Sequence, residues 1–176
     1  RSREQGPDKP FLDVWFESDT TGYVVGAYGL LLKTTDGGQT WQSWFDRQDN
    51  PRLMNLYAIR PAAGSLFIAG EGGTVMKLDP AAQRFVATPI DYTGSMFGIA
   101  DAGDAVLVFG LRGNAFRSAD GGSTWAKLST QLPATIETLV SLNARRRRRE
   151  LRWTSFVCAV GDQSPDAKDR VLERIR

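Results

Sequence analysis

Asp36 and Asp120 are the two residues of this chain whose setting first suggests chemistry, because a pair of carboxylates can work as acid and base. Each lies at the same place in an octet that occurs twice, as Thr34–Trp41 and as Ser118–Trp125. An Asp side chain accepts hydrogen bonds from nearby backbone amides, and glycine takes positive φ without steric cost. The octets therefore favour tight turns between antiparallel strands over acid–base catalysis. The turn residues shared by both copies are Asp36, Gly38, Thr40, Trp41, Asp120, Gly122, Thr124 and Trp125.

The composition removes most other catalytic and metal-binding chemistry. The 176 residues include no histidine and one cysteine, Cys158, so histidine-based triads, an internal disulfide and a thiolate metal cluster are impossible. We predict no catalytic residue, no cofactor and no metal, and hence no enzyme.

A repeat of about 40 residues organises the first three quarters of the chain. The glycines Gly26, Gly70 and Gly110 are 44 and 40 residues apart, and each precedes a second glycine by three positions. Short apolar runs separated by turn residues give four strands in each copy. Four strands at this period are typical of propeller blades. We therefore predict an all-β fold of three four-stranded antiparallel blades, at about 11–45, 55–88 and 95–130, in an incomplete ring.

The octets resemble the Asp-box, or bacterial neuraminidase repeat. Over residues 11–133 the blades, with Gly-x-x-Gly between the second and third strands, resemble the photosystem II assembly and stability factor family. This resemblance implies a non-catalytic protein-interaction module that holds a membrane-complex subunit during assembly. The alternative is a sialidase-like glycoside hydrolase, a family with an arginine triad, a Tyr nucleophile paired with Glu, and an Asp acid/base. Arg60 and Arg117 stand at different blade positions, so this triad cannot be placed.

The two ends of the chain differ from the blades. Residues 1–10 form a polar extension, and residues 137–176 carry 10 Lys and Arg against 6 Asp and Glu, compared with 12 against 14 in residues 1–136. The basic segment is either a diverged fourth blade or a non-native tail, with five arginines at 145–149 and a short helix expected from Ser164 to about Ile175. No aromatic residues alternate with the arginines, so we expect a solvated run and no nucleic acid partner.

The chain begins at Arg1 and not at Met, which indicates either a processed precursor or an excised piece of a longer protein. The sequence does not identify the compartment, and an exported location, periplasmic or lumenal, is favoured over a cytoplasmic one. Its apolar runs are all far shorter than the roughly 18 residues that suggest a membrane span.

A protein-binding face is predicted from topology. In a four-stranded blade, the turn between the second and third strands lies at the opposite end from the Asp-box turn, beside the linker to the next blade. These turns and linkers differ from copy to copy, as an interaction surface requires, although solvated turns would vary in the same way. The candidate residues are Tyr28, Arg52, Glu71, Tyr92 and Arg112.

Three blades are too few to close a ring, since propellers typically have four to eight. We therefore expect an open arc in which residues 137–176 cover one end or replace part of a fourth blade. The uncovered blade face is expected either to meet another chain, with self-association as one form of this, or to have lost its remaining blades by truncation. Trp15, Trp41, Trp44 and Trp125 are expected to pack between neighbouring sheets.

Overall fold

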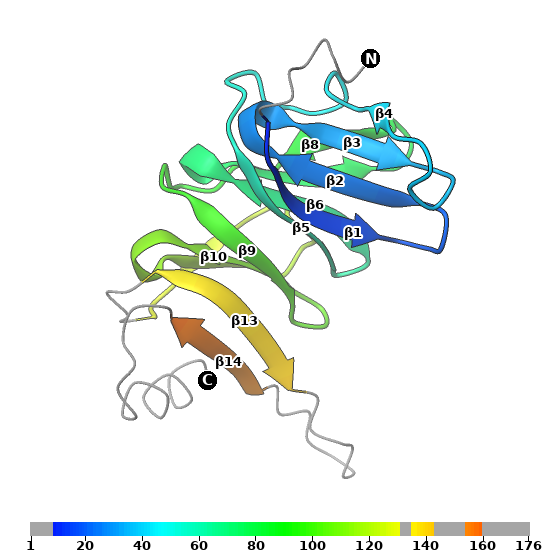
Figure 1. The fold of residues 1–176 in the computed structure, drawn as a ribbon. Helices are drawn as coiled ribbons and strands as arrows, with labels where there is room; N and C mark the ends of the chain where they lie inside the picture. Colours follow the sequence, from blue (N-terminus) through cyan, green and yellow to red (C-terminus); the bar gives the residue numbers. More distant parts are fainter. Residues whose placement is uncertain (1–8, 131–134, 143–153, 160–176) are drawn as a thin grey trace, which may run out of the picture.

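Antiparallel sheets dominate the computed structural model, which describes residues 9–130, 135–142 and 154–159. Three of these sheets have four strands each, hydrogen-bonded in chain order from one edge to the other. The predicted fold of three four-stranded antiparallel blades is therefore confirmed (Figure 1).

The blades have the following strands. Blade 1 contains β1 (Phe11–Phe16), β2 (Gly22–Gly26), β3 (Leu31–Thr34) and β4 (Gln42–Ser43). Blade 2 contains β5 (Leu56–Ala62), β6 (Ser65–Gly70), β7 (Val75–Asp79) and β8 (Arg84–Ala87). Blade 3 contains β9 (Met96–Asp101), β10 (Val106–Gly110), β11 (Ala115–Ser118) and β12 (Ala126–Leu128).

A two-stranded sheet follows blade 3, formed by β13 (Ile136–Leu142) and β14 (Thr154–Ala159). The first strand pair of every sheet has a register irregularity just after its first residue. Those first residues, spaced 45, 40 and 40 positions apart, are Phe11, Leu56, Met96 and Ile136. The strand β13 thus begins where a fourth blade would begin, and it lies beside β9 in Figure 1.

The fourth sheet departs from the spacing of the blades at its second strand. Ile136 pairs with Ala159, which is therefore the counterpart of Gly26, Gly70 and Gly110. A constant period would place that counterpart near Arg152, so the connection between β13 and β14 is longer than in the other blades. The arginines at 145–149 and the helix expected from Ser164 lie outside the described residues.

The paired glycines of each blade have two different physical roles. The first lies against the linker before its blade: a Cβ would come within 2.3 Å of the Pro10 oxygen at Gly26, 2.4 Å of the Asn55 oxygen at Gly70 and 2.2 Å of the Ser95 oxygen at Gly110. The second has a left-handed backbone, with φ of 68°, 75° and 70° at Gly29, Gly73 and Gly113. At the first position a side chain is excluded by contact. At the second it is disfavoured by the backbone conformation, and at Gly73 a Cβ would also come within 1.8 Å of the Tyr92 oxygen.

Apolar side chains fill the spaces between successive blades. Between blades 1 and 2, Tyr23, Val25 and Leu31 face Ile59, Ile68, Met76 and Phe85 in one buried cluster. A second cluster joins Phe67, Ala69 and Val75 of blade 2 to Ile99, Val108 and Phe116 of blade 3. Ile136 of β13 packs in a third cluster with Phe109 and Ala115 of blade 3. The core is thus a series of inter-blade layers.

The tryptophans divide between these layers and the surface. Trp44 is buried between blades 1 and 2, with the Lys33 ammonium 4.4 Å from its ring centroid, and Trp15 is half-buried against the same cluster. Trp125 is half-buried against the layer between blades 2 and 3. Trp41 makes an edge-on contact with Phe16, at 6.1 Å between ring centroids, on the outer side of blade 1.

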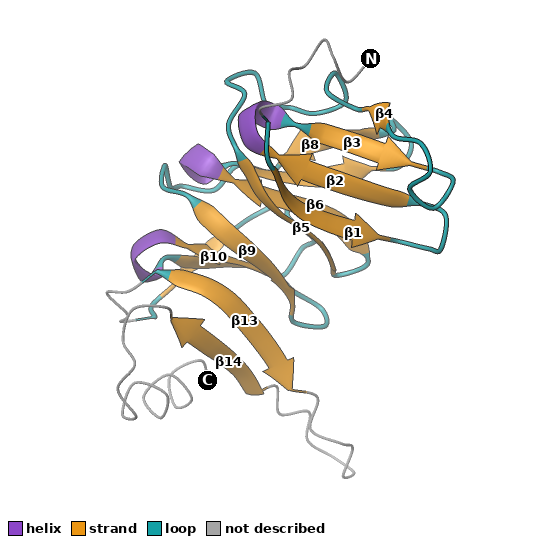
Figure 2. Cartoon of the chain, viewed as in Figure 1, coloured by secondary structure: helices purple, strands orange, loops and turns teal. Residues whose placement is uncertain are grey.

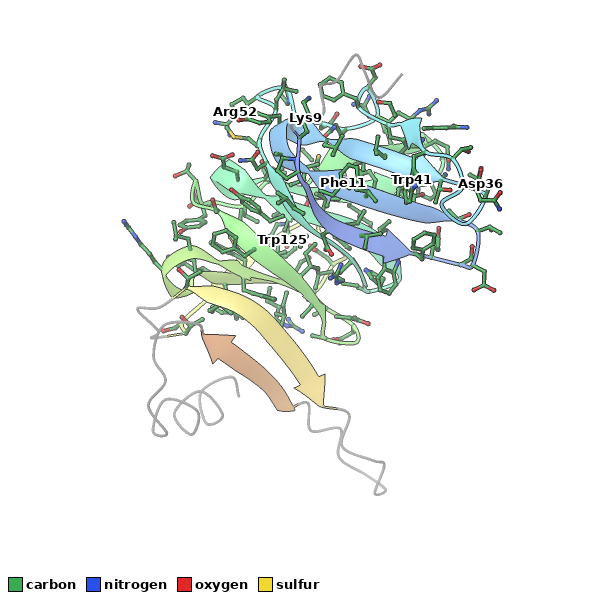
Figure 3. The ribbon with its side chains drawn as sticks, in the orientation of Figure 1. Lys9, Phe11, Asp36, Trp41, Arg52 and Trp125 are labelled. Atoms are coloured by element: carbon green, nitrogen blue, oxygen red, sulfur yellow. The ribbon has the colours of Figure 1, made fainter. Side chains whose placement is uncertain are left out.

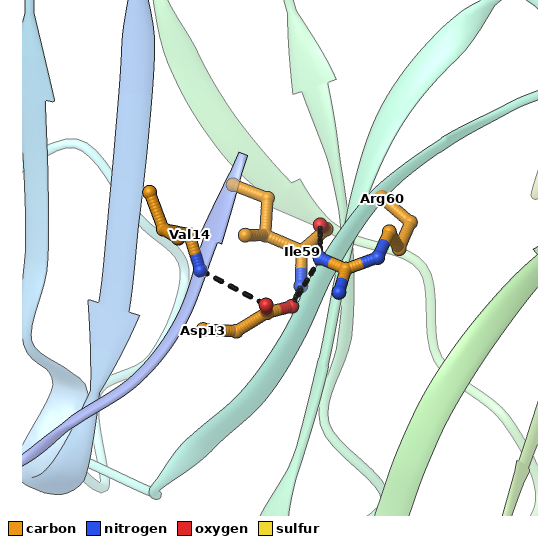
Figure 4. A network of polar contacts seen from close by, with 4 residues as sticks. All are labelled: Asp13, Val14, Ile59 and Arg60. Atoms are coloured by element: carbon orange, nitrogen blue, oxygen red, sulfur yellow. Dashed lines mark hydrogen bonds and ion pairs between the residues drawn. The ribbon is translucent and has the colours of Figure 1, made fainter. Parts of the chain in front are cut away.

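Polar contacts also join neighbouring blades. Asp13 of blade 1 accepts hydrogen bonds from the Ile59 amide at 2.8 Å and from the Arg60 guanidinium at 2.5 Å (Figure 4). Between blades 2 and 3, the Lys77 ammonium donates to the Gly121 carbonyl at 2.9 Å. The Asp13 carboxylate is mostly buried, so the arginine beside it offsets the cost of removing its charge from water.

The two Asp-boxes have nearly the same hydrogen-bond network. The Asp36 carboxylate accepts from the Thr40 amide at 2.9 Å, the Thr40 hydroxyl at 2.5 Å and the Thr34 hydroxyl at 2.7 Å. Asp120 accepts from the Thr124 amide and hydroxyl and from the Ser118 hydroxyl at 2.9, 2.6 and 2.7 Å. These hydrogen bonds lower the pKa of Asp36 to about 2, and the bonds from Thr40 have the largest effect. The equivalent bonds, those from Thr124 first, lower the pKa of Asp120 to about 2.

We predict that Gly70→Ala destabilises the protein through the clash with the Asn55 carbonyl, by about 2–3 kcal/mol in chemical denaturation. Gly64→Ala is the matched control, because a Cβ there meets nothing within 4 Å and only the φ of +72° opposes it. We expect that control to cost about 1 kcal/mol. Equal losses in the two variants would show that close approach is not what requires glycine at position 70.

We predict that the Asp-box carboxylates stabilise the fold in a pH-dependent way. The pKa of Asp36 is about 2 in the folded protein against an ordinary 3.8, so its contribution is present above 3.8 and is lost as the pH falls toward 2. The difference in unfolding free energy between the native chain and Asp36→Asn should be largest near neutral pH and shrink through this window. Asp46→Asn, at an exposed carboxylate outside the two Asp-boxes, is the control. A difference that stays constant with pH would contradict this linkage.

Candidate functional site

The two ends of each blade carry different kinds of turn. Short 3-10 turns η2 (Ala27–Gly29), η3 (Glu71–Gly73) and η4 (Leu111–Gly113) join the second and third strands, and they lie along one side of the molecule in Figure 2. The Asp-box turn of blade 1 lies at the other end, where its Gly37 amide bonds to the Thr20 carbonyl of the β1–β2 loop. Figure 3 shows Arg52 and Asp36 far apart at these opposite ends. We call the end that carries the 3-10 turns η2, η3 and η4 the turn rim.

Each 3-10 turn is fixed to the linker that precedes its own blade. The amides of Ala27, Glu71 and Leu111 donate to the carbonyls of Pro10, Asn55 and Ser95 at 3.1, 2.8 and 2.9 Å. A second bond closes each turn, from Leu30 to Ala27, from Thr74 to Glu71 and from Asn114 to Leu111. The turn rim is therefore built from three copies of one backbone arrangement.

The middle residue of each turn has a left-handed backbone. The φ values are 54° at Tyr28, 63° at Gly72 and 56° at Arg112. Glycine adopts this conformation freely, whereas other residues pay roughly 1–2 kcal/mol. Tyr28 is 60% exposed and Arg112 is exposed as well, so neither side chain regains this cost through burial in the core.

The linker between blades 1 and 2 supplies the side chains next to Gly72. Asn50 is buried and holds this loop by donating to the Met54 carbonyl and accepting from the Met54 amide, both at 2.9 Å. The Arg52 guanidinium and the Met54 sulfur come within 3.6 and 3.5 Å of where a Gly72 Cβ would be. Arg52 thus lies where the turn of blade 2 has no side chain of its own.

Glu71 and Tyr92 also lie on the turn rim, but their polar groups are engaged in holding it together. The Glu71 carboxylate accepts from the Asn55 amide at 3.3 Å. The Tyr92 hydroxyl donates to the Leu111 carbonyl and accepts from Asn114, both at 3.1 Å, and its ring packs against Phe116. The structure therefore brings all five predicted residues to one end and exposes three of them: Tyr28, Arg52 and Arg112.

Sequence reasoning missed two contributors to this end of the molecule. Lys9 precedes the Pro10 that anchors η2, lies at the same end as Arg52 in Figure 3, and places its ammonium 5.5 Å from the Phe45 ring centroid. Asn50 gave no signal in the sequence beyond its place beside Pro51. Its role depends on the fold, because it bridges residues within the linker.

The Asp-box carboxylates and the buried Tyr23 are held in fixed protonation states. The Asp36 and Asp120 carboxylates are anions above pH values near 2 and are bonded within their own turns. Tyr23, the tyrosine nearest to the inter-blade core, is 2% exposed, and burial raises its pKa to about 12. The described residues include no group of three or more His, Cys, Asp or Glu side chains that could hold a metal ion, and no helix among them is long and apolar enough to cross a membrane.

Comparison with known proteins gives matches to assembly factors of photosystem II. Residues 4–93 match the model of the family described as photosynthesis system II assembly factor YCF48. The photosystem II assembly lipoprotein Ycf48 of Prochlorococcus marinus is 44% identical over 52 residues, which are 28% of this chain and 15% of that protein. Ycf48 of Synechocystis is 36% identical over 73 residues, 41% of this chain and 21% of that protein. The chloroplastic stability/assembly factor HCF136 of Oryza sativa is 33% identical over 75 residues, 43% of this chain and 16% of that protein.

Two solved structures have the same fold. A structure described as YCF48 bound to D1 peptide superposes with a TM-score of 0.65 at 21% identity, covering 86% of this chain and 47% of that one. YCF48 from Cyanidioschyzon merolae gives a TM-score of 0.58 at 15% identity, covering 87% of this chain and 51% of that one. The chain thus spans about half the length of these solved propellers.

The matches decide between the two families that the Asp-boxes suggested. They support the assembly-factor resemblance and not the sialidase-like alternative. Because the family model covers just over half of its residues, the chain belongs to the photosynthesis system II assembly factor YCF48 family.

Proposed function

We propose that this chain is a non-catalytic assembly module that holds an extended segment of a membrane-complex subunit against the turn rim. The observation that carries this proposal is the pair of exposed side chains, Tyr28 and Arg112, held on left-handed backbones where blade 2 has Gly72. A solved relative, YCF48, binds a D1 peptide, which supports a peptide as the ligand class.

Backbone strain at an exposed position favours a role other than folding. A left-handed residue that is neither glycine nor buried lowers stability without gaining packing, and such strain concentrates at ligand-binding sites. Gly72 shows that the same turn forms with glycine, so Tyr28 and Arg112 are not needed for its backbone. Their side chains differ between blades, which gives the three equivalent turns different contacts with one partner.

The chemistry of the exposed groups fits a peptide with both apolar and acidic character. Tyr28 presents an aromatic ring with a polar end, a residue type enriched at protein interfaces. Arg52 and Arg112 present guanidinium groups that can bind a carboxylate through two parallel hydrogen bonds. Rigid anchoring of the turns keeps these groups in place before the partner arrives, which lowers the entropy cost of binding.

The proposal includes an exported location and no catalysis. Cyanobacterial relatives of the chain are named lipoproteins and plant relatives are named chloroplastic, which supports a protein that acts outside the cytoplasm. Among the described residues, the carboxylates of the Asp-boxes are occupied by their own turns, which supports a role in binding alone.

We predict that Tyr28→Gly and Arg112→Gly separate binding from stability. Each variant removes an exposed side chain and relieves a left-handed residue, so the unfolding free energy should stay constant or rise by up to about 1 kcal/mol. Binding of a fluorescent D1 peptide should weaken about tenfold in each, as for an interface hot spot. The measurements are fluorescence anisotropy and urea denaturation of the same samples.

Lys127→Ala is the matched control, because Lys127 is an exposed cation on the outer strand β12. It should leave peptide affinity unchanged. Unaltered affinity in both glycine variants, while the native chain binds the peptide, would refute the assignment of the turn rim as the binding surface.

A further inference from the structure

One residue of the linker between blades 1 and 2, Asn55, is hydrogen-bonded to the turns of both blades. Its side-chain oxygen accepts from the Tyr28 amide of η2 at 2.9 Å. Its backbone carbonyl accepts from the Glu71 amide of η3 at 2.8 Å, and its backbone amide donates to the Glu71 carboxylate at 3.3 Å. The exposed turn residue of blade 1 and the start of the turn of blade 2 are therefore joined through Asn55.

The same linker also holds the residue that follows Tyr28. The Gln48 side-chain amide donates to the Gly29 carbonyl at 2.6 Å. The Leu53 side chain lies here as well, with its Cδ2 atom 3.5 Å from where a Gly29 Cβ would be. Side chains of the linker thus bond to the amide of Tyr28 and to the carbonyl of Gly29, which fixes the backbone on both sides of Tyr28.

Tyr28 is the residue of η2 that most needs such support. Its φ of 54° is a left-handed conformation, which residues other than glycine keep only where neighbouring groups hold it. The side chain is 60% exposed, so packing of the ring in the core does not supply this support. Gly72, at the same position in blade 2, adopts a φ of 63° at no steric cost. The hydrogen bond to Asn55 therefore acts where backbone strain has to be balanced.

We propose that Asn55 is a positioning residue of the turn rim, which holds the Tyr28 backbone so that the Tyr28 side chain is oriented for the partner. This inference rests on the proposed function, because it concerns how one of the proposed anchors is kept in place. Asn55 acts through Tyr28 on one side and through Glu71 on the other, and not by contact with the partner.

The contacts of Asn55 also set the spacing between two exposed groups. Glu71 directly precedes Gly72, and the Arg52 guanidinium lies 3.6 Å from where a Gly72 Cβ would be. Asn55 therefore connects the backbone of Tyr28 with the turn beside which Arg52 lies. A fixed separation between an aromatic ring and a guanidinium favours a peptide whose apolar and acidic side chains have the matching separation, and it lowers the entropy lost on binding.

Asn55→Ala isolates the side-chain contact. The backbone of residue 55 remains, so its two bonds to Glu71 are kept and the acceptor of the Tyr28 amide is lost. We expect the variant to be folded in urea denaturation. Without any peptide, hydrogen exchange of the Tyr28 amide, followed by NMR, should be about tenfold faster, and exchange of the Glu71 amide should not change. Asn55→Asp, which keeps an acceptor oxygen at this place, should restore slow exchange at Tyr28.

Binding of the fluorescent D1 peptide separates positioning from a purely structural contact. Asn55→Ala should weaken binding about fivefold, a degree of coupling usual for residues in direct contact. In the Tyr28→Gly background the same change should have no further effect, because glycine adopts the left-handed conformation freely and carries no anchor. Gln42→Ala, which removes an exposed amide side chain from β4 of the same blade, is the matched control and should alter neither exchange at Tyr28 nor affinity.

Unchanged exchange of the Tyr28 amide in Asn55→Ala overturns the inference, whether or not the peptide binds. Full peptide affinity despite faster exchange overturns it as well. So do losses that add up in the double variant, since Asn55 would then act independently of Tyr28. A native chain that does not bind the peptide refutes the proposed function instead, and the exchange measurements then decide alone whether Asn55 holds Tyr28.

Discussion

The blades depend on one backbone contact, the hydrogen bond from the amide at the start of each 3-10 turn to the carbonyl of the linker before the same blade. This contact brings the linker so close that only glycine fits at the preceding position, as at Gly70 beside the Asn55 carbonyl. It ties the second strand of the blade to the entrance of the first strand. The turn rim is thus assembled blade by blade from local contacts, before any partner is present.

The same contact explains why the two ends of the blades have diverged in different ways. At the Asp-box end, side chains make the turn through the bonds between Asp36 and Thr40, and blade 2 has Pro80 and Arg84 at these two positions. At the turn rim, backbone and glycine make the turn, so the exposed middle residue is free to change. Tyr28, Gly72 and Arg112 can therefore differ while the backbone stays the same.

Most of the fold could be predicted from the sequence because glycine spacing and apolar alternation directly reflect local backbone geometry. The order of the strands in each blade and the place of both Asp-boxes follow from such local signals. The position of Ala159 could not be predicted, because it depends on the length of the connection after β13 and not on a repeat. The sequence also could not predict that Glu71 and Tyr92 hold the turn rim together. Their hydrogen-bond partners, Asn55 and Leu111, come close to them only in the folded protein.

The central claim is that the turn rim, and not the Asp-box end, meets the partner. Hydrogen–deuterium exchange with and without the D1 peptide tests it most directly, since a bound segment slows exchange of the amides that it covers. The account predicts slower exchange in residues 27–29, 50–55 and 111–113, with residues 34–41 and 118–125 unchanged. Protection confined to the two Asp-boxes, with residues 27–29 and 111–113 unaffected, would contradict it.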